Sequence, residues 1–246
     1  MSFCPTAINA ANTAVIAPTQ DERDGLEIRL AEGSPPSPGS AVSPIDLAQE
    51  IEDALRAEGE IDGTGTATYV NGVVYTGGFQ KALHHGKGRM ESPGGYAYDG
   101  DWVAGVKEGK GKITYPDGAV YDGDMLKGQR AGQGTLTTKD GLTYVGAWKE
   151  GQINGLGKLT QANGDVYEGL LVNGKRHGTG KVTYANGDTY EGGFAEDKRQ
   201  GKGVFRGTDG YVYDGDWVAG RIEGAGKVTY PDQSVYEGSF KNDVAD

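Results

Sequence analysis

The chain has 246 residues, of which 44 are glycine and 14 tyrosine, and its formal net charge is −11. Glycine well above its usual share of ~7% argues against a helical or doubly wound core and favours β-strands and turns. The negative net charge argues against the broad basic surface that nucleic-acid binding needs, so we expect no nucleic-acid partner.

The number of cysteines and the length of the apolar stretches indicate the cellular compartment. Cys4 is the single cysteine, so no intrachain disulfide can form, and no Cys/His cluster has the spacing of metal ligands. The first 20 residues lack the basic and apolar regions of a secretory signal, and no stretch of 18 apolar residues occurs. We therefore expect a cytoplasmic location, which includes the inner face of a membrane, with no metal and no cofactor.

The N-terminal segment 1–42 is acidic and is predicted to be mostly disordered. Its stretch 34–40 is rich in Ser and Pro and is typical of an extended linker, whereas residues 26–30 fit a short strand. Residues 1–60 hold 3 Arg and 11 acidic residues, so this segment carries most of the net negative charge of the chain.

The next segment, 43–59, predicts a short amphipathic helix. Ser43 fits the N-cap, Pro44 the first helical position, and Gly59 the stop. One apolar stripe runs along it through Leu47, Ile51 and Leu55. We expect this helix to cover the exposed edge of the first repeat.

Residues 63–240 contain a repeat of 23 residues. A tyrosine recurs with this spacing at Tyr75, Tyr98, Tyr121, Tyr144, Tyr167, Tyr190, Tyr213 and Tyr236. Each of these tyrosines is followed by a glycine two residues later and by a large apolar residue four residues later, and each is preceded by a G-x-G pair. Eight units that start at the G-x-G pair fit into 63–240, which leaves 241–246 as a tail.

The turn residues set the strand register of each unit. The segments 115–118 and 184–187 suit a type I turn followed by a left-handed glycine, which is a three-residue hairpin loop with a bulge. Pairing outward from the loop places Val182 opposite Tyr190, Gly180 opposite Gly192 and Gly178 opposite Phe194, all on one face. The same register pairs opposite charges on the other face, namely Asp99 with Arg89, Asp122 with Lys112, Glu168 with Lys158, Glu191 with Lys181 and Glu237 with Lys227.

This pattern resembles that of MORN (membrane occupation and recognition nexus) repeats. Their consensus, about Y-x-G-x-W-x-x-G-x-x-x-G-x-G, matches the segment 167–180 closely. The chain departs from it where Met125 and Leu171 replace the aromatic residue, where Ala82, Asp197 and Asp243 replace the linker glycine, and where Gln233 replaces the last turn glycine. We predict an all-β fold, an elongated single-layer antiparallel solenoid of about eight MORN hairpins preceded by a short capping α-helix.

The motifs that carry enzyme chemistry are missing from this sequence. The segment 169–175 superficially fits a phosphate-binding loop, but Arg176 stands where a Ser or Thr would bind Mg²⁺, and its glycines are repeat positions. The sequence contains neither a G-x-S-x-G elbow nor a two-histidine metal motif. We therefore expect a non-enzymatic protein, with an unrecognised enzyme as a distant third alternative.

Two binding functions remain open, and the first is a scaffold for protein–protein interaction. Its candidate groove aromatics, most of which we expect to form the core, are Tyr69, Trp102, Tyr115, Trp148, Tyr184, Phe194, Trp217 and Tyr230. The second, peripheral binding to anionic phospholipid, is implied by the family name, and its candidate row is Lys175, Arg176, His177, Lys198 and Arg199. Residues 61–246 carry a net charge of only −3, so an anionic membrane attracts this region weakly.

The edge of the last predicted strand has no evident strand or helix to pair with it. This open edge predicts a homodimer through the C-terminal hairpin.

Overall fold

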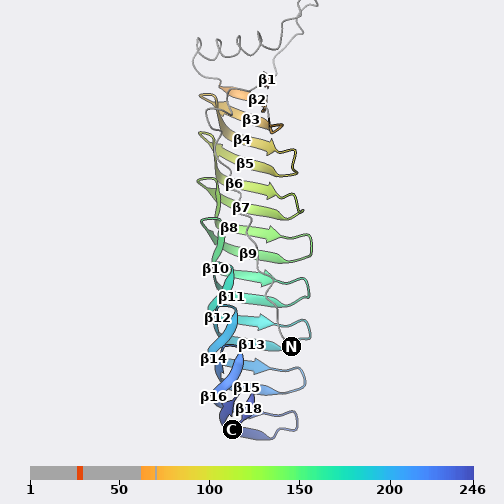
Figure 1. Cartoon of the computed structure of the whole chain (residues 1–246), viewed down its shortest axis with the longest axis vertical. Helices are drawn as coiled ribbons and strands as arrows, with labels where there is room; N and C mark the ends of the chain where they lie inside the picture. Colours follow the sequence, from red (N-terminus) through yellow and green to blue (C-terminus); the bar gives the residue numbers. More distant parts are fainter. Residues whose placement is uncertain (1–26, 30–61, 70) are drawn as a thin grey trace, which may run out of the picture. The chain divides into compact units, whose positions relative to one another are not determined.

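The computed structural model describes residues 27–29, 62–69 and 71–246. It divides into two compact units, the N-terminal unit (described residues 27–29, 62–69 and 71–130) and the C-terminal unit (131–246). In each unit the strands follow one another in sequence order (Figure 1). The predicted helix over 43–59 lies outside the described residues, as does the segment 1–42 apart from 27–29.

Each unit is an antiparallel meander in which a strand pairs with its neighbours in the sequence. The N-terminal unit contains β1 (Glu27–Arg29), β2 (Gly63–Thr68), β3 (Val74–Gln80), β4 (Leu83–Glu91), β5 (Ala97–Val103), β6 (Val106–Thr114) and β7 (Val120–Leu126). β8 (Gln129–Thr137) begins in this unit and continues into the C-terminal unit, where it is followed by β9 (Thr143–Lys149), β10 (Gln152–Thr160), β11 (Val166–Val172), β12 (Lys175–Thr183), β13 (Thr189–Ala195), β14 (Lys198–Arg206), β15 (Val212–Val218), β16 (Arg221–Thr229), β17 (Val235–Lys241) and β18 (Val244–Ala245). The described residues contain no helix, and the predicted all-β antiparallel fold is confirmed. β1 also confirms the short strand predicted within 26–30.

The loops within the predicted hairpins, such as 115–119, have the predicted turn, and we call them the long loops. In the loop 115–119, the Gly118 N–H donates to the Tyr115 carbonyl (2.9 Å) and the Tyr115 N–H donates to the Ala119 carbonyl (2.8 Å). Gly118 has a φ of +87°, in the left-handed region that the turn requires.

The predicted register is confirmed on both faces of the sheet. On the core face, Val182 faces Tyr190, Gly180 faces Gly192 and Gly178 faces Phe194. On the other face, the structure aligns Arg89 with Asp99, Lys112 with Asp122, Lys158 with Glu168, Lys181 with Glu191 and Lys227 with Glu237. Salt bridges join Arg89 to Asp99 (3.7 Å) and Lys158 to Glu168 (3.2 Å).

The segments between the predicted hairpins form a second kind of hairpin, which the sequence patterns did not predict. Between β5 and β6, Ala104 and Gly105 have φ angles of +48° and +82°, as in a two-residue type I′ turn. This turn pairs Val103 with Val106, and a register shift follows as the pairing approaches Gly100. Since both sides of these turns are paired strands, side chains next to the turns alternate between the two faces of the sheet.

The repeat tyrosines form the centre of the core, and the glycines make room for their rings. Tyr98 is fully buried, and its hydroxyl donates to the Asp101 carbonyl (2.8 Å). A Cβ atom on Gly111 would lie 2.3 Å from the Tyr98 ring, and one on Gly100 would lie 2.6 Å from the Tyr98 hydroxyl. The same contacts recur at Tyr75, Tyr144, Tyr167, Tyr190 and Tyr213, so the Y-x-G and G-x-G motifs together build one ring site.

Where the residue four positions after the tyrosine is aromatic, it packs edge-on against the tyrosine ring. The Trp102 ring centroid lies 5.2 Å from that of Tyr98 in its own repeat and 5.4 Å from that of Tyr75 in the preceding repeat. The indole N–H of Trp102 donates to the Gly88 carbonyl (3.1 Å), and Trp217 bonds Gly203 in the same way (3.0 Å). The core of each unit is therefore continuous from one repeat to the next.

Side-chain acceptors connect several of the turns to the repeat before them. Glu108 Oε2 accepts a hydrogen bond from the backbone N–H of Lys127 in the next tight turn (2.8 Å). Equivalent bonds join Asp62 to Lys81, His85 to Ala104 and Gln200 to Ala219 at the tight turns, and Asp165 to Ala185 and Asp188 to Thr208 at the long loops. We call these bonds the turn caps.

A short additional strand, β18, follows the last predicted strand. The predicted tail 241–246 turns back at Asn242 and Asp243, and β18 pairs with β17 through Phe240 with Ala245 and Lys241 with Val244. The tail therefore covers one end of the edge that led us to expect a homodimer. Nothing in the described part of the chain forms a helix of the length and apolarity needed to cross a membrane.

Candidate protein-binding face

One repeat position, five residues after the large core residue, carries mostly basic side chains on the core face. We call these residues the inner column, and they are His84, Lys107, Arg130, Ile153, Arg176, Arg199 and Ile222. Strand pairing sets Lys107 opposite Trp102 and Arg199 opposite Phe194. The tight turns therefore direct these basic side chains toward the aromatic rings.

Lys107 is buried in the N-terminal unit, with 2% of its surface exposed. Its Nζ donates a hydrogen bond to the Tyr96 hydroxyl (2.8 Å) and lies 4.7, 5.0 and 5.7 Å from the ring centroids of Tyr96, Tyr98 and Trp102. Burial lowers the pKa of Lys107 from 10.5 to about 7, because an ammonium group loses its hydration here. The rings partly replace this hydration through cation–π attraction.

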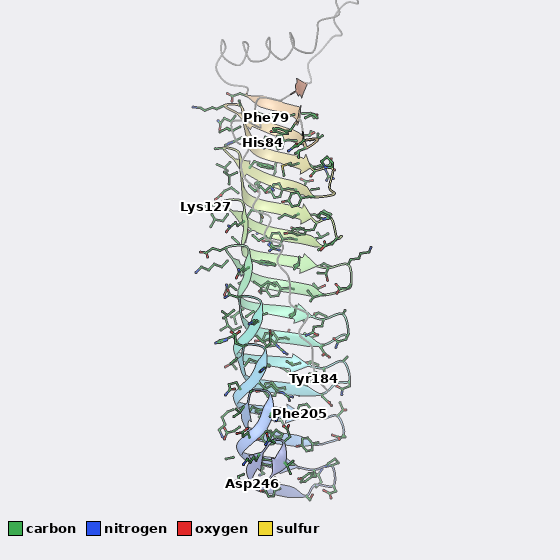
Figure 2. The ribbon with its side chains drawn as sticks, in the orientation of Figure 1. Phe79, His84, Lys127, Tyr184, Phe205 and Asp246 are labelled. Carbon is green, nitrogen blue, oxygen red and sulfur yellow. The ribbon has the colours of Figure 1, made fainter. Side chains whose placement is uncertain are left out.

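His84 precedes Lys107 in the inner column and is also buried. Figure 2 labels His84 in the N-terminal unit. Its ring stacks on Tyr75 at 3.6 Å, and its Nε2 lies 2.6 Å from the Tyr69 hydroxyl. Burial, and to a smaller extent the charge of Lys107, lowers the pKa of His84 to about 4. The imidazole is therefore neutral at physiological pH.

In the C-terminal unit, two arginines occupy the inner column. Arg176 lies 5.2 Å from the Phe194 ring and is held by Asp197, whose Oδ1 is 3.3 Å from Arg176 Nε and whose carbonyl accepts from Nη2 (2.7 Å). Arg199 lies 4.1 Å from the Trp217 ring and 5.5 Å from the Tyr190 ring. Both side chains are half-buried, so their charges lie against the rings of the core face.

A second set of aromatic residues lies near the long loops of the C-terminal unit. We call it the loop-side stripe, and it consists of Tyr184, Phe205, Tyr211 and Tyr230. Consecutive ring centroids along this stripe are 6.4, 6.2 and 6.2 Å apart. Tyr230 is 38% exposed and the other three are half-buried. Figure 2 labels Tyr184 and Phe205 in this stripe.

The structure separates the predicted groove aromatics into two groups. Trp102, Trp148, Phe194 and Trp217 are each at most 5% exposed, and they form the core as we expected for most of this set. The other four are more accessible, with Tyr69, Tyr115 and Tyr184 half-buried and Tyr230 exposed. Only this second group leaves ring surface for a partner.

The predicted basic row is divided between different environments. Lys175 is exposed and pairs with Glu196 (2.5 Å), and Lys198 is exposed as well. Arg176 and Arg199 lie against rings of the core face instead. His177 is partly buried. The five residues therefore do not form one continuous exposed row.

Sequence reasoning missed His84 and Lys107 as members of a buried column, and Phe205 and Tyr211 as members of the stripe. The 23-residue spacing could have found the column, since His84, Lys107, Arg130, Arg176 and Arg199 all fall on it. The stripe has no such signal, because Phe205 and Tyr211 occupy two different repeat positions.

The repeated hairpins, the tyrosine–glycine core and the partly exposed aromatic face define a β-repeat protein. A model of the MORN repeat matches residues 75–95, 98–120, 121–143, 144–166, 167–189, 190–210 and 213–235. These matches cover more than half of the chain, so the chain belongs to the MORN-repeat family. No curated protein sequence matches it.

Solved structures of other proteins are also similar to the chain. The TCP domain of SAS-4 (dCPAP) from Drosophila melanogaster, in complex with a proline-rich motif of Ana2 (dSTIL), is 13% identical, with a TM-score of 0.32, and the match covers 74% of this chain and 89% of that one. The G-box domain of the microcephaly protein CPAP is 14% identical, with a TM-score of 0.45 and coverage of 74% and 98%. The TCP10 domain of Danio rerio CPAP is 16% identical, with a TM-score of 0.27 and coverage of 74% and 85%.

Proposed function

We propose that the chain is a non-enzymatic scaffold that binds a protein partner through the loop-side stripe. The observation that carries this proposal is the stripe itself. Its rings contact one another in a row at 6.2 to 6.4 Å, yet all four keep exposed surface. Rigid aromatic rings of this kind supply large contact areas at low entropic cost.

The division of the predicted aromatics supports this assignment. The buried tryptophans are committed to the core, since Trp217 is 3% exposed and bonds Gly203. The stripe lies beside this core, so its rings sit on a rigid support. A supported aromatic surface suits an extended segment of a partner, whose side chains lie across the rings.

The placement of the predicted basic row leads us to prefer a protein partner over a membrane. Lys175 is paired with Glu196, and Arg176 with Asp197. Paired and half-buried cations give an anionic bilayer less attraction than a free exposed row would. We therefore treat binding to an anionic membrane as the alternative that the test can support.

The test compares two variants of the full chain. Tyr184→Ala combined with Tyr230→Ala removes stripe surface, and Leu156→Ala, at a residue 71% exposed, removes an exposed apolar side chain outside the stripe. We expect the stripe variant alone to lose the partners captured by the wild-type chain, while both variants keep its thermal melting temperature.

Capture that is unchanged in the stripe variant would contradict the proposal. Salt-sensitive co-sedimentation with anionic vesicles, lost on changing Lys175, Arg176, Lys198 and Arg199 to Glu, would instead support the membrane alternative.

A further inference from the structure

Arg199 differs from Arg176 in its charge partner. Asp197 occupies the second position of the tight turn beside Arg176 and pairs with its guanidinium. The equivalent residue beside Arg199, 23 positions further on, is Gly220. Within the described part of the chain, no carboxylate lies within salt-bridge distance of Arg199.

Three acidic groups on neighbouring strands and turns are already engaged. Asp197 is bonded to the backbone N–H of Arg176 (2.9 Å) as well as to its side chain, and Asp243 accepts from the Ile222 N–H (2.7 Å). Asp216 pairs with Lys202 (2.8 Å). The Arg199 guanidinium therefore keeps N–H donors for an external acceptor.

The surroundings of Arg199 favour a carboxylate as that acceptor. Its guanidinium lies 4.1 Å from the Trp217 centroid, and it is half-buried. A guanidinium beside a ring can still offer a fork of N–H donors that matches both oxygens of a carboxylate. Partial burial strengthens such a pair relative to one in open water.

Arg199 and the loop-side residue Phe205 lie on the same face of strand β14, since Arg199 pairs with Phe194 and Phe205 pairs with Tyr190. The Tyr190 ring, which is fully buried, lies 5.5 Å from Arg199. Burial raises the pKa of Tyr190 to about 12, although the charge of Arg199 lowers it, and the Tyr184 hydroxyl raises it as well. In the N-terminal unit, Arg130 lies 5.9 Å from the ring of Tyr115, at the same repeat positions as Arg199 and Tyr184. By this equivalence, we expect the Arg199 side chain to extend along the core face toward Tyr184.

The length of the stripe fits an extended segment of chain. From Tyr184 to Tyr230 the stripe crosses two repeats, or four strand spacings of ~4.8 Å, which is ~19 Å. About six residues of extended peptide at ~3.3 Å each span this distance. A free anion would occupy only the site of Arg199, which lies on β14 between the two ends of the stripe.

We propose that Arg199 and the loop-side stripe bind an extended acidic peptide of a partner protein. A Glu or Asp carboxylate of the peptide pairs with the guanidinium, and apolar side chains of the peptide lie on the stripe. This inference rests on the proposed function, and it adds the chemistry of the partner to it.

The experiment uses the full chain and a displayed library of random 12-residue peptides. We expect the wild-type chain to enrich peptides that carry an acidic residue together with apolar or aromatic residues. For a synthetic enriched peptide, Arg199→Gln should weaken binding at least tenfold. Replacing the peptide's Glu by Gln should weaken it to a similar extent, and the two changes together should add little more.

Two further variants make the outcome specific. Arg199→Lys keeps the charge but not the forked donors, so it should lose part of the affinity. Arg206→Gln, an exposed arginine on the same strand β14, removes the same charge and should bind like the wild type.

Enriched peptides without acidic residues, or equal binding to the Arg199→Gln variant, would overturn this inference. If those peptides still depended on Tyr184 and Tyr230, the proposed function would stand. A library that yields no peptide bound through the stripe would overturn both.

Discussion

Lys107 is predicted to destabilise the N-terminal unit, and its replacement by Met should therefore stabilise it. A fall in pKa from 10.5 to about 7 corresponds to ~5 kcal/mol of unfavourable free energy at ~1.36 kcal/mol per pKa unit. Cation–π attraction from the rings of Tyr96, Tyr98 and Trp102, at ~2 to 3 kcal/mol in total, offsets part of this. We expect Lys107→Met to raise the free energy of unfolding by ~2 to 3 kcal/mol at pH 6.

The pH dependence follows from the same shift. Between pH 7 and 10.5 the unfolded chain binds the proton more than the folded chain does, so wild-type stability should rise with pH across this window. Below pH 7 both states are protonated and the penalty stays constant. The advantage of the Met variant should therefore shrink as the pH rises from 7 to 9.

Native-state hydrogen exchange of the amides in β5 and β6, supported by urea unfolding, measures this difference. Lys112→Met, an exposed lysine on the same strand as Lys107, is the matched control and should change stability by less than ~0.5 kcal/mol at either pH. A Met variant that is less stable than the wild type at pH 6 would refute the reasoning. It would mean that the aromatic cage favours the ammonium group more than burial disfavours it.

Two further predictions concern the same unit. Gly111→Ala should destabilise it by ~3 kcal/mol or more in urea unfolding, because the new Cβ would lie 2.3 Å from the buried Tyr98 ring. The control is Gly94→Ala, whose new Cβ would have no atom closer than 3.9 Å, and it should change stability by less than ~1 kcal/mol. Equal effects would contradict the ring-site explanation of the glycines. The pKa of His84 falls from 6.5 to about 4, so the unfolded chain takes up the extra proton between these values and stability should drop by up to ~3 kcal/mol as the pH falls through this window. His84→Gln should reduce that drop in the same assay, and a variant with the wild-type pH profile would count against a buried neutral imidazole.

The fold could be predicted largely from spacing, because a strict repeat multiplies every local signal. One turn sequence, such as 184–187, fixes a register, and the charge pairs on the opposite face test it independently. The tight turns were not predicted, because their first residues, such as Ala104 and Glu150, have a left-handed φ although they are not glycine. Their conformation follows from strand pairing on both sides, which is a tertiary effect.

The candidate site was harder to predict for the same reason. Once a segment such as 173–174 is a turn flanked by strands, the side chains after it alternate between faces, and Arg176 lies on the core face beside a ring. A reading of Lys175, Arg176 and His177 as one linear basic row misses this alternation. The core tryptophans could be anticipated, because large apolar residues at a fixed repeat position are the natural source of a continuous core.

The turn caps give the repeat array a direction. Glu108 caps the turn at Lys127, and Asp165 caps the loop at Ala185, so the acceptor lies in each case on the earlier repeat. Removing a repeat from the C-terminal end of a unit therefore leaves the turn caps of the remaining repeats complete. Removing one from the N-terminal end leaves the next turn without its acceptor. Two other bonds run the opposite way, because the N–H groups of Arg176 and Ile222 donate to Asp197 and Asp243 of the following repeat. The ends of an array therefore differ in which backbone groups a truncation leaves without a partner.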